Sequence, residues 1–110
     1  MSDYYKHDHL KAFGTIREGQ KDLGDKFFAY YNAVFEDGAL SQREKALIAL
    51  AVSHVVQCPY CIEAYTKSSL QHGADLEQMT EAVHVATAIR GGASLVHGMQ
   101  MLEIARKTGM

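Results

Sequence analysis

The chain has few of the features that attach a protein to a membrane, a nucleic acid or a covalent framework. Its 110 residues carry a net charge of −2 and include no tryptophan, two cysteines and one proline. This balance gives no basic surface for nucleic acid or anionic lipid, and no run of about 18 apolar residues could span a bilayer. Residues 1–8 lack the apolar stretch of a secretory signal. We expect a cytoplasmic protein of one domain, residues 22–110, preceded by an N-terminal segment, residues 1–21.

The two cysteines, Cys58 and Cys61, enclose a Pro-Tyr dipeptide. Cytoplasmic thiols are kept reduced, so a pair with this spacing is redox-active or metal-binding more often than structural. A structural zinc site would need a second such pair or paired histidines. The sequence has neither, and we expect no metal and no other cofactor. The alternative for the two cysteines is a pair of small side chains packed in the core.

Helical periodicity and helix-end signals predict an all-α fold, since no strand-like alternation runs far along the chain. The predicted helices run from Asp22 to Phe35, from a capping box at Ser41 to near Gln57, from Cys58 to His72, from Asp75 to Arg90, and from there to Lys107. We expect Gly91 and Gly92 to separate the last two. Leu95, Met99 and Leu102 are predicted to point into the core.

The second predicted helix is apolar on every side between Ala46 and Val52. Such a helix either lies at the centre of a bundle or is covered by another subunit. In a chain this short we favour the second explanation, and the sequence therefore predicts a homo-oligomer.

Proline fits the first turn of a helix and is costly in its interior. Pro59 therefore predicts that Cys58 is the N-cap of the third helix and that Cys61 occupies its third position. Helical residues three apart have Cα atoms about 5 Å apart, which lies within the disulfide range of about 4.4–6.8 Å. The unpaired amides at a helix start stabilise a thiolate. We expect Cys58 to be the more accessible sulfur, Cys61 the more enclosed, and a sulfenic acid on either to be resolved by the other.

Two further side chains are candidates for the site. His54 precedes Cys58 by one turn, and an imidazole suits proton transfer near neutral pH. Its alternative is a histidine at the core edge whose nitrogens bond to the backbone. Tyr65 shares a helical face with Cys61 and could hydrogen-bond a thiol or a bound peroxide. Its alternative is an aromatic core residue.

Several stretches together carry a family resemblance: residues 27–35, 43–54, 58–67, 80–83 and 89–96. Over residues 22–105 the chain resembles the AhpD-like branch of the carboxymuconolactone decarboxylase family, and most of all the small peroxidase-like proteins associated with arsenosugar biosynthesis. The resemblance implies an AhpD-like helical bundle that assembles as trimers or hexamers. It also implies reduction of a peroxide or a small disulfide by Cys58 and Cys61, regenerated by a cellular thiol system.

The chain departs from the family pattern at two positions. The family has a histidine four residues after the second cysteine and a glutamate twelve residues before the first, where this chain has Tyr65 and Ala46. Glu44 is two positions away, about 200° around the helix, and should not face the same way. The proton relay is therefore absent, or rebuilt around His54. Besides a dithiol oxidoreductase, two functions stay open: binding of trivalent arsenic by the two thiolates, and lactone decarboxylation, which needs no cysteine pair.

Overall fold

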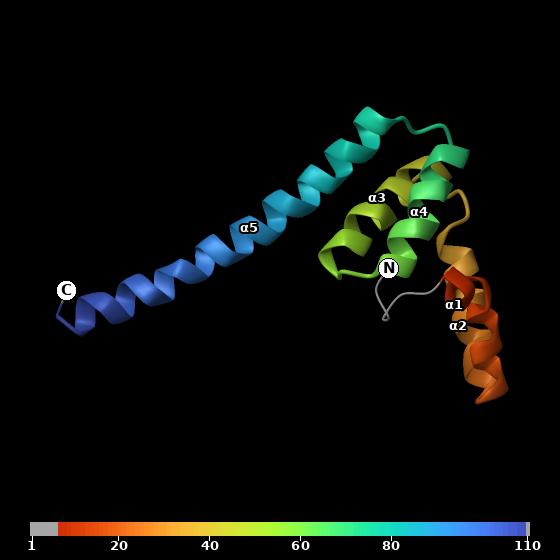
Figure 1. The fold of residues 1–110 in the computed structure, drawn as a ribbon, viewed down its shortest axis with the longest axis horizontal. Coiled ribbons are helices and arrows are strands. Elements are labelled where there is room, and N and C mark those ends of the chain that lie inside the picture. Colours follow the sequence, from red (N-terminus) through yellow and green to blue (C-terminus); the bar gives the residue numbers. More distant parts are fainter. Residues whose placement is uncertain (1–6, 110) are drawn as a thin grey trace.

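The computed structural model describes residues 7–109, without the side chains of His7 and Leu10. Within this range every regular element is helical (Figure 1), which confirms the predicted all-α fold. The elements are α1 (His7–Lys11), the 3₁₀ helix η1 (Phe13–Glu18), α2 (Lys21–Val34), α3 (Gln42–Val55), α4 (Pro59–Gln71) and α5 (Leu76–Lys107).

The centre of the molecule is the pair α3 and α4, and the first half of α5 packs against α3 (Figure 1). α3 begins with the predicted capping box: the Glu44 amide donates to the Ser41 hydroxyl at 3.1 Å, and the Ser41 amide donates to the Glu44 carboxylate at 2.8 Å. Leu50, Ala74 and Met79 form the buried cluster between these helices. This small core joins α3 to the segment that follows α4 and to the first turn of α5.

The N-terminal helices join this centre through side chains. Lys45 of α3 donates from its ammonium group to the carbonyl oxygens of Val34 and Glu36. The C-terminal end of α2 is thereby held against α3. Farther out, the aromatic ring of Phe35 stacks on that of Tyr65 in α4, with centroids 5.2 Å apart and planes 19° apart. These contacts hold the C-terminal end of α2 near α4.

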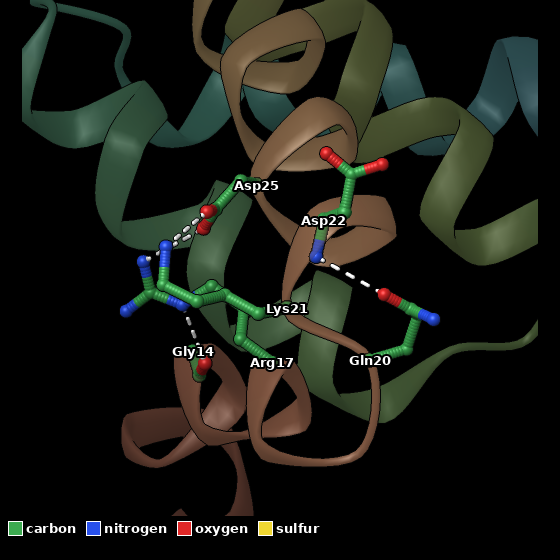
Figure 2. Close-up of polar contacts among 6 residues, drawn as sticks. All are labelled: Gly14, Arg17, Gln20, Lys21, Asp22 and Asp25. Atoms are coloured by element: carbon green, nitrogen blue, oxygen red, sulfur yellow. Dashed lines mark hydrogen bonds and ion pairs between the residues drawn. The ribbon is translucent and has the colours of Figure 1, made fainter.

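η1 is fastened to the first turns of α2 by an exposed polar cluster (Figure 2). The Arg17 guanidinium donates to the Gly14 carbonyl at 2.9 Å and reaches the Asp25 carboxylate at 3.5 Å, while the Lys21 ammonium donates to Asp25 at 2.6 Å. The hydrogen bond from Lys21 lowers the pKa of the Asp25 carboxyl. α1 and η1 are therefore carried by α2 as one unit.

The predicted break at Gly91 and Gly92 is wrong, because α5 is continuous for 32 residues. Glycine costs about 1 kcal/mol relative to alanine inside a helix, but it does not forbid helical dihedrals. The guanidinium of Arg90 donates to the Val55 carbonyl and holds α5 against the end of α3 just before the glycines. Beyond that bond the helix has left the centre of the molecule (Figure 1).

The prediction that the last helical segment points inward is also wrong within this chain. Leu95 is 80% exposed and Met99 is 61% exposed, and only Leu102 is half-buried. The Cα radius of gyration is 18.7 Å, against about 13 Å for a compact domain of this length. Despite the length of α5, none of the helices in residues 7–109 combines the length and apolarity that a bilayer crossing requires.

Candidate functional site

The turn between α3 and α4 places Cys58 at the start of a helix, as the position of Pro59 predicts. Gln57 has a φ of 57°, which turns the chain sharply, and the Cys58 amide then donates to the Ser53 carbonyl at 3.0 Å. Cys58 is the N-cap of α4, and its sulfur accepts a hydrogen bond from the Cys61 amide at 3.2 Å. A sulfur occupies the position that a serine or aspartate oxygen ordinarily fills at a helix start.

The two thiols are both free and half-buried, but they differ electrostatically. Burial, together with the hydrogen bond and charge of Cys58, raises the pKa of the Cys61 thiol to about 11. Desolvation therefore outweighs the favourable field of the helix start at this sulfur. The Cys58 sulfur is the one that accepts the hydrogen bond of the Cys61 amide. This asymmetry, which the sequence did not resolve, favours Cys58 as the attacking sulfur and Cys61 as the thiol that keeps its proton.

Both sulfurs open into a cavity of about 370 Å³ at the start of α4. The lining residues are His9, Phe13, Tyr31, Cys58, Tyr60, Cys61 and Ala64. The sulfurs thus lie on the wall that α4 contributes, and side chains of α1, η1 and α2 form the opposite wall. Most of the lining is aromatic or apolar, so the cavity suits a small molecule with an apolar body.

A hydrogen bond links the two walls of the cavity. Nδ1 of His9 lies 3.2 Å from the hydroxyl oxygen of Tyr60, across 51 positions of sequence. The two rings are 6.3 Å apart between centroids and tilted by 37°. An imidazole and a phenol therefore meet beside the cysteine pair.

Tyr31 brings a second hydroxyl to the cavity from α2. Burial raises the pKa of the Tyr31 phenol, and the nearby Cys61 and Cys58 raise it further when they are charged. The phenol therefore stays protonated at neutral pH and can donate a hydrogen bond to an anion in the cavity.

The other two predicted site residues, His54 and Tyr65, do not line this cavity. Nδ1 of His54 donates to the Leu50 carbonyl oxygen at 2.8 Å. Tyr65 stacks on Phe35 and packs against the buried cluster around Leu50. Each therefore makes the contacts of the alternative that the sequence left open, a backbone-bonded histidine and an aromatic core residue. Their catalytic roles stay predictions.

Sequence reasoning did not identify His9, Phe13, Tyr31 or Tyr60 as site residues. Tyr60 stands inside the cysteine motif and could have been found there. Tyr31 belongs to an aromatic pattern in α2, and packing in the hydrophobic core was a sufficient explanation for that pattern. His9 and Phe13 come from a polar terminal stretch, and nothing local in the sequence connects that stretch to residues some fifty positions later.

The described part of the chain holds no cluster that would bind a metal ion. Within residues 7–109 no three histidine, cysteine or acidic side chains lie close enough together to coordinate one.

The fold and the site define a class of helical proteins that carry a free dithiol at a helix start. Comparison with known proteins shows the family to which this chain belongs. The chain belongs to the carboxymuconolactone decarboxylase family, whose model matches residues 21–103. It is 43% identical over 104 residues to "Uncharacterized protein 4 in cox locus" of Paracoccus denitrificans, covering 94% of each chain. An uncharacterised protein of Cupriavidus necator is 27% identical over 92 residues, covering 84% of this chain and 81% of that one.

Among solved structures, the chain is similar to a crystal structure of a protein from Methanobacterium thermoautotrophicum. The TM-score is 0.74 at 29% identity, over 78% of this chain and 97% of the other. The agreement supports the helical arrangement of the matched part of the chain.

Proposed function

We propose that this chain is a dithiol oxidoreductase of the AhpD-like branch, which reduces a hydroperoxide or a small disulfide through Cys58 and Cys61. One observation carries the proposal: the Cys58 sulfur caps α4 through the Cys61 amide, and both sulfurs open into the same apolar cavity. A thiol reductant of the cytoplasm would return the oxidised pair to the dithiol.

The reaction with a hydroperoxide follows from the asymmetry of the thiols. The Cys58 thiolate attacks the terminal oxygen, the O–O bond breaks, and the other oxygen leaves as an alcohol after taking a proton. The Cys58 sulfenic acid then reacts with the Cys61 thiol, which forms the disulfide and releases water. Two electrons from an external dithiol complete the cycle. A disulfide substrate would instead react with Cys58 by thiol–disulfide exchange.

The test is to add a hydroperoxide to the reduced protein and to follow both thiols by mass spectrometry. We expect loss of two thiols and formation of one disulfide within each chain. Cys61→Ser should stop at a sulfenic acid that dimedone traps, and Cys58→Ser should react at least about 100-fold more slowly. The proposal fails if both thiols of the unaltered protein survive the peroxide. Full lactone decarboxylase activity in the double serine variant would favour that chemistry instead.

A second candidate function is capture of trivalent arsenic, since two sulfurs within one helical turn face a common cavity. Soft thiophilic ions bind best to paired thiolates. The resemblance to arsenosugar-associated proteins remains a prediction. Mass spectrometry of the reduced protein with arsenite should show a single adduct that Cys58→Ser plus Cys61→Ser abolishes. Absence of the adduct, or its survival in the double variant, removes this candidate.

We also propose that the working form is a homo-oligomer, a trimer or a hexamer. Within residues 7–109 two apolar surfaces are uncovered: the far half of α5, and a groove of about 410 Å³ bordered by Ile48 and Val52 of α3 and by Val56, which follows that helix. Exposed apolar area of this extent marks an interaction site. Another copy of the chain is the proposed cover, because a symmetric assembly brings both surfaces to every subunit.

A further inference from the structure

The cavity raises the question of where the leaving oxygen obtains its proton. Tyr65 and Ala46 occupy the positions at which the family that this chain resembles has its proton relay. Tyr65 is packed in the core. Nδ1 of His54 is engaged by the Leu50 carbonyl. The Cys61 proton is needed in the second step, where the hydroxyl of the Cys58 sulfenic acid has to leave as water. The donor therefore has to be another group that lines the cavity.

We propose that Tyr60, supported by His9, is this proton donor, so that α1 supplies part of the active site. Both side chains line the cavity that holds the sulfurs, and they are hydrogen-bonded at 3.2 Å. The inference rests on the proposed function and deepens it.

Tyr60 fits this role better than the other phenol of the cavity. Burial and the two sulfurs raise the pKa of Tyr31, so its proton is given up less readily. The Tyr60 hydroxyl has an imidazole beside it, and His9 is exposed to solvent on its other side. A proton that leaves Tyr60 can therefore be replaced from water through the ring of His9.

The step balances in atoms and electrons. A lone pair of the Cys58 thiolate forms the S–O bond to the terminal oxygen of the hydroperoxide. The O–O bonding pair goes to the departing oxygen, which takes the Tyr60 phenolic proton and leaves as an alcohol or water. His9 returns a proton to the phenolate and is itself reprotonated by solvent. Sulfur is oxidised by two electrons and the peroxide is reduced by two.

The packing of the N-terminal segment keeps His9 in place. The Phe13 ring meets Phe28 of α2 edge to face, with centroids 5.1 Å apart. Arg17 and Asp25 fasten the same segment at its other end (Figure 2). His9 is thus held next to α4 by the unit that also forms the opposite wall of the cavity.

The experiment compares two oxidants that differ in their need for a proton at the leaving atom. Hydrogen peroxide requires one, whereas dithiobis-nitrobenzoate releases an aromatic thiolate that does not. Single-turnover rates of thiol loss are measured with each oxidant in Tyr60→Phe, His9→Gln and the double variant. The readout is the ratio of the peroxide rate to the disulfide rate. His84→Gln, which alters an exposed histidine in the first half of α5, is the matched control.

We expect the ratio to fall about 100-fold in Tyr60→Phe, at the lower end of the range for general acid catalysis, and about tenfold in His9→Gln. The double variant should be no worse than Tyr60→Phe alone, because His9 acts through Tyr60. Added imidazole should restore part of the ratio in His9→Ala, which a merely structural role of His9 would not permit.

An unchanged ratio in Tyr60→Phe overturns the proposal, whether both rates keep their values or both fall by the same factor. Failure of the underlying function looks different, because the unaltered protein would then keep both thiols in hydrogen peroxide. That result removes the role of the pair without any variant.

Discussion

Apolar side chains pack together at the N-terminal end of the chain and are left exposed at the C-terminal end. At the N-terminal end α1, η1 and α2 fold back toward α4, and their aromatic rings meet one another: Phe13 with Phe28, Phe28 with Phe27, and Phe27 with Tyr31, at centroid separations of 5.1, 5.4 and 5.6 Å. At the C-terminal end α5 extends away from the molecule (Figure 1) and leaves Val96 69% and Ile104 64% exposed.

The difference shows which surfaces a single copy can complete by itself. The N-terminal segment closes one wall of the thiol cavity from within the chain. α5 buries Met79 and Ala86 in its first half and is bonded to α3 by Arg90, and within residues 7–109 the apolar side chains of its far half are mostly exposed. The cavity is therefore a property of one copy, whereas the cover of the far half of α5 is proposed to come from another.

The largest effect should come from placing a charge on the uncovered end. Leu95→Glu would put a carboxylate into the proposed interface, where an uncompensated charge costs about 3–5 kcal/mol. We expect association to weaken by at least about 100-fold, so that light scattering after size exclusion reports a monomer at micromolar concentration.

The matched control is Gln100→Glu, which adds the same charge about 140° around the helix from Leu95. This variant should keep the mass of the unaltered protein. A monomer in all three proteins, or an assembly that Leu95→Glu leaves intact, would contradict the comparison, since α5 would then need no partner.

The next largest effect concerns the two sulfurs of the thiol cavity. With less than one equivalent of iodoacetamide at pH 8, peptide mapping should find Cys58 labelled well before Cys61. The ordinary thiol pKa is 9.0, and the value of about 11 at Cys61 leaves about 100-fold less thiolate than an unperturbed cysteine would have. Labelling of Cys61 should increase only as the pH approaches 11.

The same shift predicts a pH dependence of stability. Because the folded protein holds the Cys61 proton more tightly than the unfolded chain does, stability from this group is present below pH 9 and declines as the pH rises toward 11. For the labelling experiment, the reference is denatured protein, in which both cysteines should label equally. Equal labelling of the two in the folded state would show that the sulfurs are not differentiated.

The smallest effect tests how tightly the N-terminal segment is packed. A Cβ on Gly24 would lie 2.5 Å from Cγ of Arg17 and 3.3 Å from its Cα, so Gly24→Ala must displace η1 from α2. Such overpacking costs about 1–3 kcal/mol, which offsets the gain of about 1 kcal/mol from helix propensity. We expect a lower melting temperature and faster alkylation of Cys58.

Gly14→Ala serves as the control, since its nearest neighbour is the end of the Arg17 side chain at an ordinary 3.6 Å. It should leave both the melting temperature and the alkylation rate close to those of the unaltered protein. If Gly24→Ala behaves in the same way, η1 does not limit access to the sulfurs.

Helix starts were predictable from the sequence because their signals are local. The box at Ser41 forms as expected, and Asp75 accepts the Gln78 amide at 2.8 Å at the start of α5. Pro59 places Cys58 at the N-cap for the same kind of reason. Each of these predictions depends on groups within one helical turn of each other.

Helix continuity and cavity lining could not be predicted in this way. Two adjacent glycines permit both a break and a helix, and a bond between Arg90 and Val55, 35 residues apart, holds the helix at that point. His9 meets Tyr60 only because α2 carries α1 back to α4. Tyr65 shares a helical face with Cys61, but its ring instead stacks on that of Phe35.

The sequence by itself determined an all-helical chain with a dithiol at the start of a helix, since backbone capping and proline geometry act over three or four residues. The tertiary structure alone decided which side chains face that dithiol and which half of α5 stays uncovered. Those outcomes depend on packing between segments far apart in the chain, and neither local propensity nor residue spacing encodes such packing.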